Sequence, residues 1–405
     1  MSDKRKYFVI LGGNFVNIGA EAMTFVTVSA LKKRYPNCEI VMVSQFDASK
    51  DNSNFTFRVL DLSERVIKHS VKTRFDPEYV VSGMAKLMLG KGNNFKQTRV
   101  LRELLTKCSA VFDISGYAIS SQWPNEITLS KLRYVDLFTS NGIPFYFMPQ
   151  SFGPFEYDDN KEYMLLRLRE SLPKSSKIFV REDEGYQLLS SLIGKDRVAK
   201  SYDMVLQSRD IDREDIYKIA PDIKKVNIET SGNVAVIPNM RNFDHGNKEE
   251  ILSLYRDVVQ LLLDLGKNVY LISHSAEDKA ACGMIKEKFL KNSGVIQVAE
   301  RIDSWNFDGL IRQFDFAIAS RYHSIVHSYK AGVPCIALGW ATKYHELLKT
   351  VDQSQYIFDV RDLGKKDIIL SAIEQMSTLV KKEKATIQQR VAAIQETNCF
   401  DSIDF

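Results

Sequence analysis

The sequence of 405 residues lacks the patterns that mark several common classes of protein. Its five cysteines are scattered and form no Cys-x-x-Cys pair, which argues against a disulfide framework and favours reduced thiols in a cytoplasmic protein. No segment is long and apolar enough to be a transmembrane helix, so we expect any membrane contact to be peripheral. The glycine-rich stretch at residues 12–19 has neither the Gly-x-Gly-x-x-Gly spacing of a dinucleotide site nor the Gly-Lys-Ser/Thr of a P-loop. Asp47 follows the second predicted strand, where an acidic residue holds the ribose in NAD-binding proteins. The wrong glycine spacing nevertheless disfavours NAD binding.

The overall charge is also close to balanced. Lys and Arg number 55 against 51 for Asp and Glu, so bulk charge does not predict nucleic-acid binding. Basic residues are nevertheless in excess from Arg65 to Lys107, where Met84, Leu87 and Met88 lie among them. This mixture is typical of a surface that contacts membrane headgroups or a phosphorylated partner. The alternative is a solvated helical face with an ordinary core stripe.

Short apolar segments alternate with longer amphipathic ones, which predicts βαβ units and parallel sheets. Strands are predicted at Tyr7–Leu11, Glu39–Ser44, Ala110–Ile114, Phe145–Met148, Lys177–Val180, Val234–Ile237, Val269–Ile272, Val295–Val298, Phe316–Ala319 and Cys335–Leu338. Helices are predicted at Glu21–Arg34, Thr98–Lys107, Thr128–Thr139, Glu184–Leu192, Lys248–Leu265, Glu277–Leu290, Phe307–Phe314 and Ile325–Ala331.

The chain is too long for one ordinary hydrophobic core. We predict an α/β protein with two Rossmann-like domains, residues 1–208 and 232–365, that face a common cleft. A polar linker is predicted at residues 209–231, and a C-terminal helix and tail at residues 366–405.

The segment Ser320-Arg321-Tyr322-His323-Ser324 carries the strongest functional signal. It lies between a predicted strand and a predicted helix, where free backbone N–H groups and the helix dipole favour an anion. The Arg321 guanidinium can bind a carboxylate or phosphate through two hydrogen bonds, and His323 can transfer a proton near neutral pH. We therefore expect an anion site with an acid–base group beside it.

Other polar residues and glycines also follow predicted strands. Because ligands bind at the carboxyl ends of parallel strands, this pattern predicts a polar ligand that carries hydroxyl or phosphate groups. The residues are Asn14, Asn17, Gly19, Glu21, Gln150, Arg181 and Asn239. Arg181 is equally compatible with binding a ligand and with pairing to Glu182 or Asp183.

A metal site in the same region is an alternative, because His323 and His327 are four residues apart on one predicted helix. No Glu lies between them, and no third ligand is apparent in the sequence. Zinc is therefore disfavoured, and His327 alone is better explained as a helix residue.

Taken together, these residues resemble the polysaccharide pyruvyl transferase family. The resemblance runs from about Tyr7 to Leu348, and its pieces occur in the order of the family. They are Gly13-Asn14-x-x-Asn17-x-Gly19-x-Glu21, Pro149-Gln150-Ser151-Phe152-Gly153-Pro154, Val180-Arg181-Glu182, Tyr202-Asp203, and Ser320-Arg321-Tyr322-His323-Ser324 with Gly332-Val333-Pro334 and Lys343.

The resemblance implies a GT-B-like fold and a reaction. The enzyme would transfer pyruvate from phosphoenolpyruvate to two hydroxyls of a sugar in a cell-surface polysaccharide or its precursor, forming a cyclic ketal without a metal or organic cofactor. Arg181 and Arg321 would hold the donor, and His323 would be the general acid. The remaining substrate-binding residues would be Asn14, Asn17, Gly19, Glu21, Gln150, Asn239, Ser320 and Lys343. A lipid-linked sugar acceptor at the inner face of the membrane, held by the Arg65–Lys107 region, is a further hypothesis.

The sequence differs from the family pattern at two loops, and two other functions remain open. The family commonly has Asp where Ala20 stands, and Ser115-Gly116-Tyr117 replaces part of a glycine run followed by Asp. Glu21 and Glu126 are candidates for the general base. One rival function is a GT-B glycosyltransferase that uses a nucleotide sugar and holds its ribose through Glu346. The other is a non-catalytic glycan-binding relative.

Overall fold

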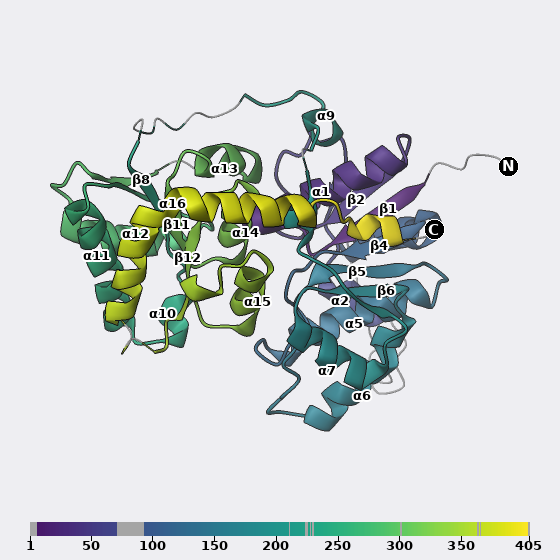
Figure 1. Cartoon of the computed structure of the whole chain (residues 1–405). Helices are drawn as coiled ribbons and strands as arrows, with labels where there is room; N and C mark the ends of the chain where they lie inside the picture. The colour runs from purple at the N-terminus through teal and green to yellow at the C-terminus, as the bar shows by residue number, and fades with distance from the viewer. Residues whose placement is uncertain are drawn as a thin grey trace.

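The computed structural model describes residues 6–70, 93–209, 211–222, 226, 228, 231–299, 302–362, 364 and 366–403. Figure 1 shows two lobes, each built around one sheet, with a long C-terminal helix lying across both. The first lobe carries the sheet of strands β1 to β7, and the second carries the sheet of strands β8 to β13. The predicted fold class of two parallel Rossmann-like sheets is confirmed.

The first sheet has seven parallel strands in the order β3-β2-β1-β4-β5-β6-β7. The chain moves outward from β1 to β3 and then returns to the other side of β1 at β4, so the strand order reverses between these two strands. The strands are β1 (Tyr7–Leu11), β2 (Glu39–Val43), β3 (Arg58–Leu60), β4 (Ala110–Asp113), β5 (Phe145–Gln150), β6 (Lys177–Val180) and β7 (Val198–Lys200).

The second sheet repeats this plan with six parallel strands in the order β10-β9-β8-β11-β12-β13. Its reversal lies between β8 and β11. In open parallel sheets such a reversal leaves a crevice beyond the carboxyl ends of the strands, where ligands bind. The strands are β8 (Asn233–Ile237), β9 (Asn268–Leu271), β10 (Val295–Gln297), β11 (Phe316–Ala319), β12 (Cys335–Gly339) and β13 (Ile357–Asp359).

The described helices connect and cover the strands. In the first half of the chain they are α1 (Ile18–Arg34), α2 (Glu64–Ser70), α4 (Asn93–Lys107), α5 (Asn125–Thr139), α6 (Lys161–Ser171), the 3-10 turn η1 (Leu172–Lys174), α7 (Asp183–Ile193), α8 (Met204–Gln207) and α9 (Arg213–Ile216). In the second half they are α10 (Asn242–His245), α11 (Lys248–Asp264), α12 (Asp278–Lys286), η2 (Glu287–Phe289), α13 (Ser304–Ile311), α14 (Tyr322–Lys330), α15 (Thr342–Thr350), η3 (Ser354–Tyr356), α16 (Lys366–Ile394) and η5 (Cys399–Ser402).

Several helices begin earlier in the chain than predicted, and for two of them the capping residue explains the observed start. Helix α1 begins at Ile18 because the side chain of Asn17 accepts the backbone N–H of Gly19. Helix α13 begins at Ser304 because Asp303 caps it in the same way. The helix predicted at Glu277–Leu290 was too long, because its last turn is the 3-10 turn η2.

Part of the segment predicted as a linker, residues 209–231, is packed against the first lobe. Helix α9 packs against α1. The backbone N–H of Thr56 donates to the carbonyl of Ile216 at 2.9 Å, and the rings of Phe55 and Tyr217 stack with centroids 5.5 Å apart. This part of the connection is therefore part of the first lobe's surface.

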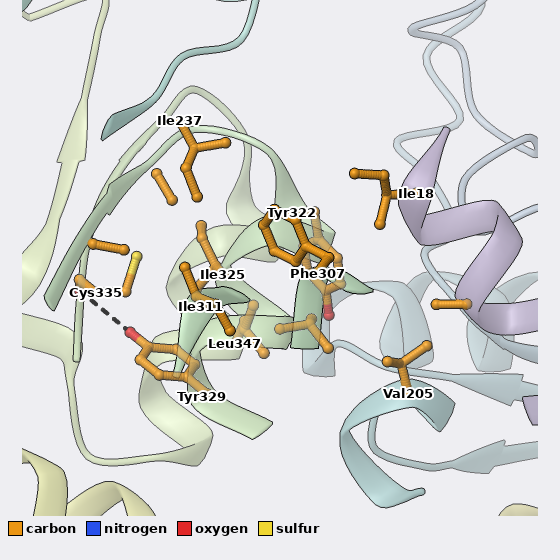
Figure 2. Close-up of a cluster of buried hydrophobic side chains, with 14 of the residues drawn as sticks. Ile18, Val205, Ile237, Phe307, Ile311, Tyr322, Ile325, Tyr329, Cys335 and Leu347 are labelled. Atoms are coloured by element: carbon orange, nitrogen blue, oxygen red, sulfur yellow. Dashed lines mark hydrogen bonds between the residues drawn. The ribbon is translucent and has the colours of Figure 1, made fainter. Parts of the chain in front are cut away.

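A single hydrophobic cluster joins the two lobes. Helices α1 and α8 of the first lobe contact α13 and α14 of the second. Figure 2 shows Ile18 and Val205 on one side of this cluster and Phe307 and Tyr322 on the other. Because these side chains are buried together, the lobes share an apolar interface rather than meeting only across water.

The C-terminal segment adds a second connection between the lobes. Helix α16 packs on α11 and α14, and the residues after it reach the first lobe. There the ring of Phe400 lies 6.3 Å from that of Phe112, and Nη1 of Arg34 donates to the carbonyl of Phe400 at 2.8 Å. The last turn of the described chain thus completes the packing of the first lobe.

Candidate active site

The carboxyl ends of the two sheets border a cleft of about 270 Å³. Seven of the predicted site residues line it, and they come from both lobes. These are Asn14, Asn17, Arg181, Asn239, Arg321, His323 and Lys343. The cleft is therefore the place where the sequence signals converge.

Arg181 follows β6 and is almost completely buried, with 4% of its side chain exposed. Its Nη1 donates to Oδ2 of Asp203 at 2.6 Å, and its Nη2 donates to the Gly116 carbonyl at 2.8 Å and to Oγ of Ser151 at 2.7 Å. The guanidinium also stacks on the ring of Tyr322 at 4.2 Å, a contact between the two lobes. Arg181 therefore contributes positive charge to the cleft while most of its donors are already used by the protein.

His323 lies in the first turn of α14 and faces the first lobe. Its Nε2 is 3.5 Å from Oδ2 of Asp203, and 12% of its side chain is exposed. Burial lowers the pKa of His323 below 6.5, and the nearby Arg181 charge lowers it further, while the Asp203 carboxylate opposes both effects. In the ligand-free cleft, His323 is therefore neutral at pH 7.

The imidazole of His323 packs directly on Gly19, at the start of α1. A Cβ atom at position 19 would lie 2.3 to 2.6 Å from the Cγ, Nδ1 and Cβ atoms of His323, closer than non-bonded atoms approach. Gly19 is thus required by a close approach between the lobes. It supports the predicted acid–base group instead of lining the cleft.

Arg321 is held by two carboxylates beside the cleft. Its Nε and Nη2 donate to the Asp278 carboxylate at 2.7 to 3.2 Å, and Nη2 also contacts Glu277. Arg241 lies close by, with its Nη2 3.4 Å from Glu277, and it also lines the cleft. Two guanidinium groups therefore meet at this wall, and only Arg321 was in the predicted site.

Two helices begin at the cleft without a side-chain cap. The N-cap residues are Arg321 for α14 and Ala341 for α15, and neither side chain accepts a hydrogen bond from the helix. The first N–H groups of each helix and its positive dipole end are thus available to an anion. The anion site predicted at residues 320–324 includes the first of these two helix starts.

Lys343 lies in the first turn of α15 among aromatic rings. Its Nζ is 4.5 Å from the centroid of the Tyr117 ring and 5.9 Å from that of Trp340, residues that belong to different lobes. Burial among these rings lowers the pKa of Lys343 to about 7, with a further contribution from the positive charge of Arg181. Lys343 is therefore able to gain or lose a proton near neutral pH.

Three of the predicted polar residues have structural partners. Asn17 caps α1, and Oδ1 of Asn14 accepts the backbone N–H groups of Val16 and Asn17 at 3.1 Å each. Asn239 donates to the carbonyl of Ser320 at 3.1 Å. Asn14, Asn17 and Asn239 still line the cleft, so these bonds hold them at its wall.

Glu21, Gln150 and Ser320 lie outside the cleft lining. Oε2 of Glu21 accepts the backbone N–H of Ser304 at 2.7 Å, which caps α13 across the lobe interface. Gln150 is completely buried and donates to Asp113 of the neighbouring strand. Oγ of Ser320 is completely buried at 2.6 Å from the Tyr255 hydroxyl. Gln150 ends β5 and Ser320 follows β11, whereas Glu21 lies in the first turn of α1. The sequence pattern did not determine which way these side chains point.

Glu126, the other candidate for the general base, is on α5 and pairs with Arg133 through contacts of 2.6 and 3.2 Å. It does not line the cleft. Neither carboxylate considered from the sequence is therefore positioned to act on a ligand there.

His323 and His327 point to different partners. Nδ1 of His327 is 2.5 Å from Oδ1 of Asp308, on the side of α14 that faces α13, whereas His323 faces Asp203. Within the described residues, no three His, Cys, Asp or Glu side chains are grouped so that they could hold a metal ion.

Sequence reasoning missed several cleft residues. Arg241 lines the cleft and was not among the predicted site residues. Asp203 of the Tyr202-Asp203 motif does not line the cleft, but it lies 3.5 Å from Nε2 of His323. Tyr117, Trp123 and Trp340 form an aromatic part of the wall that had no recognisable spacing in the sequence. The one sequence feature that could have identified them is their position in the segments that follow β4 and β12.

A second, larger cavity of about 690 Å³ lies between the lobes and includes Glu346 among its lining residues. Arg181 borders both cavities. Glu346 accepts the backbone N–H of Asp183 at 3.4 Å and so caps α7. The residue that the nucleotide-sugar alternative requires therefore lies outside the strand-end cleft.

The region predicted to contact a membrane is described only in part, since residues 71–92 lie outside the described ranges. In the described part, Lys96, Arg99 and Arg102 are exposed on α4. Of the helices that the structure describes, none combines the length and the apolar character needed to cross a membrane.

Comparisons with solved structures show the same fold at low sequence identity. The UDP-GlcNAc 2-epimerase from Methanocaldococcus jannaschii is 14% identical, with a TM-score of 0.56 over 91% of this chain and 92% of that one. The E. coli trehalose-6-phosphate structure bound with UDP-2-fluoro glucose is 10% identical, with a TM-score of 0.53 over 96% of each chain. These likenesses show a GT-B architecture and nothing about the reaction.

Sequence comparison is more specific. No curated protein matches the chain significantly. Residues 17–342 match the profile of the family described as polysaccharide pyruvyl transferase, and this range includes most of the cleft residues. The chain therefore belongs to the polysaccharide pyruvyl transferase family, and it is a transferase.

Proposed function

We propose that this protein transfers the pyruvyl group of phosphoenolpyruvate to two hydroxyls of a sugar, in a cell-surface polysaccharide or its precursor. The family membership supports polysaccharide pyruvylation in general. The single observation that carries the choice of donor is the meeting of two uncapped helix N-termini with Arg321, Arg241 and Lys343 beside a buried histidine. Phosphoenolpyruvate carries a phosphate and a carboxylate on three carbons, and this wall offers donors for both.

In the proposed mechanism, Arg321 and the N-terminus of α14 bind one anionic group of the donor. The negative charges of the bound donor raise the pKa of His323, which then takes up a proton. His323 gives this proton to the methylene carbon, and a sugar hydroxyl attacks the adjacent carbon. Phosphate leaves, and the second hydroxyl closes the ketal. Each hydroxyl loses one proton. In this proposal Lys343, with a pKa of about 7, accepts one of them, and His323, neutral after protonating the methylene carbon, accepts the other.

The acceptor side of the proposal uses the first lobe and the aromatic wall. Asn14 and Asn17 of the first lobe line the cleft together with Arg321 of the second, and Tyr117 and Trp340 offer rings against which a sugar can lie. Glu21, Gln150 and Ser320 do not line the cleft and bond to other groups of the protein, as described above. Arg181 contributes its charge and its stacking on Tyr322.

Titration calorimetry with phosphoenolpyruvate tests the donor. We expect wild type to bind, and Arg321→Ala to bind about 10- to 100-fold more weakly, because a charge-assisted hydrogen bond contributes about 1.5–3 kcal/mol. EDTA should change neither result. Arg58→Ala is a matched control, because Arg58 is also held by two carboxylates, Glu39 and Glu103, but lies on the outer strand β3. Equal binding by wild type and Arg321→Ala would contradict the proposed donor site.

The nucleotide-sugar alternative makes the opposite prediction in a thermal-shift screen. A UDP- or GDP-sugar would stabilise the protein, and phosphoenolpyruvate would not. The position of Glu346 outside the cleft counts against this alternative. Formation of a ketal on any acceptor would exclude the non-catalytic glycan-binding alternative.

A lipid-linked acceptor predicts binding to anionic membranes. We expect the protein to bind phosphatidylglycerol vesicles, and the triple replacement of Lys96, Arg99 and Arg102 by Ser to weaken binding about 100-fold, since each charge near the surface contributes about 1 kcal/mol. The control variant replaces three exposed lysines of the second lobe by Ser. These are Lys279, Lys288 and Lys291. Sedimentation with vesicles measures the affinity of both variants. An equal loss of affinity in the two variants would contradict the assignment of α4 as a membrane-binding surface.

A further inference from the structure

Asp203 occupies a position between the lobes that the proposed mechanism does not yet use. It follows β7 and is completely buried. Its Oδ1 accepts the backbone N–H of Val205 at 2.9 Å, and its Oδ2 accepts Nη1 of Arg181 at 2.6 Å. The same Oδ2 lies 3.5 Å from Nε2 of His323, which belongs to the other lobe. The carboxylate is thus fixed by the first lobe and directed at the acid–base group of the second.

The two ring nitrogens of His323 have different surroundings. Nε2 is buried, and the Asp203 carboxylate is the polar group beside it. The ring packs against Gly19 on the side of Nδ1, and 12% of the side chain remains exposed where His323 lines the cleft. Because Nε2 is inaccessible, a proton that passes between His323 and a ligand has to pass through Nδ1.

We propose that Asp203 is the positioning residue for His323: it keeps a proton on Nε2, so that Nδ1 is the atom that exchanges a proton with the ligand. A carboxylate beside one imidazole nitrogen fixes both the tautomer and the ring orientation. One part of this inference rests on the proposed function: that the exchanged proton goes to the methylene carbon of the donor.

The charges around His323 give Asp203 a second effect. The other titratable groups beside it are Arg181 at the end of β6, His327 one turn along α14, His274 after β9, and Tyr322, whose ring centroid is 5.4 Å from that of His323. Burial, Arg181 and His327 all lower the pKa of His323, and Asp203 raises it. Loss of the carboxylate therefore removes the group that opposes the other three, and the pKa of His323 should fall.

Nuclear magnetic resonance of the ¹⁵N-histidine-labelled full chain, without any ligand, tests the arrangement directly. The His323 signals are those that disappear in His323→Gln. In wild type we expect the tautomer with the proton on Nε2. In Asp203→Asn we expect the His323 titration midpoint to move down by at least about one pH unit, as the loss of a close opposite charge requires. The Nδ1-protonated tautomer in wild type would overturn the proposal, as would an unchanged midpoint in the variant.

Asp136→Asn is the matched control. Asp136 on α5 is also a buried carboxylate that pairs with an arginine, Arg167, at 2.7 Å, and its other side-chain partners are Ser171 and Lys174. Both variants should lower the melting temperature, but only Asp203→Asn should move the His323 midpoint. If Asp203→Asn does not fold, the tautomer in wild type still decides the question.

The catalytic consequence has its own readout. A general acid has to be protonated, so the transfer rate should fall as pH rises through the pKa of His323, and Asp203→Asn should shift this fall to lower pH. Asp136→Asn should leave the pH profile in place. If the resonance results are as expected and no pyruvate is transferred, the positioning of His323 stands and the proposed function fails. An unshifted pH profile in an active Asp203→Asn variant would overturn the positioning role.

Discussion

Replacement of His323 by Gln is expected to reduce the rate of pyruvyl transfer by about 10²- to 10⁴-fold, the usual contribution of a general acid. Gln keeps the size and polarity of the side chain but cannot give a proton to carbon. Because Arg321, Arg241 and the N-termini of α14 and α15 remain, phosphoenolpyruvate should still bind within a few-fold of its wild-type affinity. A steady-state assay of phosphate release, together with calorimetry, separates the two effects.

His345→Gln is the control for this prediction. His345 is exposed on α15, two residues from Lys343, but it does not line the cleft. Its replacement should leave both the rate and the affinity unchanged. A His323→Gln variant that transfers pyruvate at the wild-type rate would remove His323 from the mechanism, and one that fails to bind the donor would make it a binding residue.

Gly19→Ala is expected to have the second largest effect, although it adds only one methyl group. The new Cβ would lie within 2.6 Å of three atoms of the His323 side chain. Either the imidazole turns away from Asp203 or the start of α1 moves away from α14. We expect at least a tenfold loss of transfer activity and a destabilisation of about 1–3 kcal/mol, the usual cost of overpacking. Activity and urea unfolding measure the two parts.

Gly283→Ala is the matched variant in the second lobe. Gly283 lies within α12, and a Cβ atom there would meet nothing within 4 Å. Activity should be unchanged, and the helix should gain about 0.5–1 kcal/mol. Full activity in Gly19→Ala would show that the lobes are not in close contact at His323 during the reaction.

The central strands were predictable because each is a continuous buried apolar run, as in Val234–Ile237 and Phe316–Ala319. The strands at β3, β7 and β13 were not predicted. Each has three residues, and each lies at the edge of its sheet, where most of its positions are not fully buried. Such short segments carry no alternation that separates them from a loop.

The site was predictable to the extent that strand ends determine it. Arg321, His323 and Lys343 follow strands of one sheet and do line one cleft. Gln150 and Ser320 also follow strands, but their side chains bond inside the lobes, and the direction of a side chain is not encoded in its position along the chain. Pairing between Asp203 and His323 depends on how the two lobes dock, which no local pattern describes.

The packing of the C-terminal residues onto the first lobe has a consequence for the order in which the protein can assemble. Ring contact between Phe400 and Phe112 places a residue made after all the described strands into the packing of the first sheet. Domains usually complete their folding in the order of synthesis. Here the first lobe is synthesised first, but its packing is completed only after the second lobe and α16 have been synthesised. Part of its apolar surface therefore stays uncovered until then.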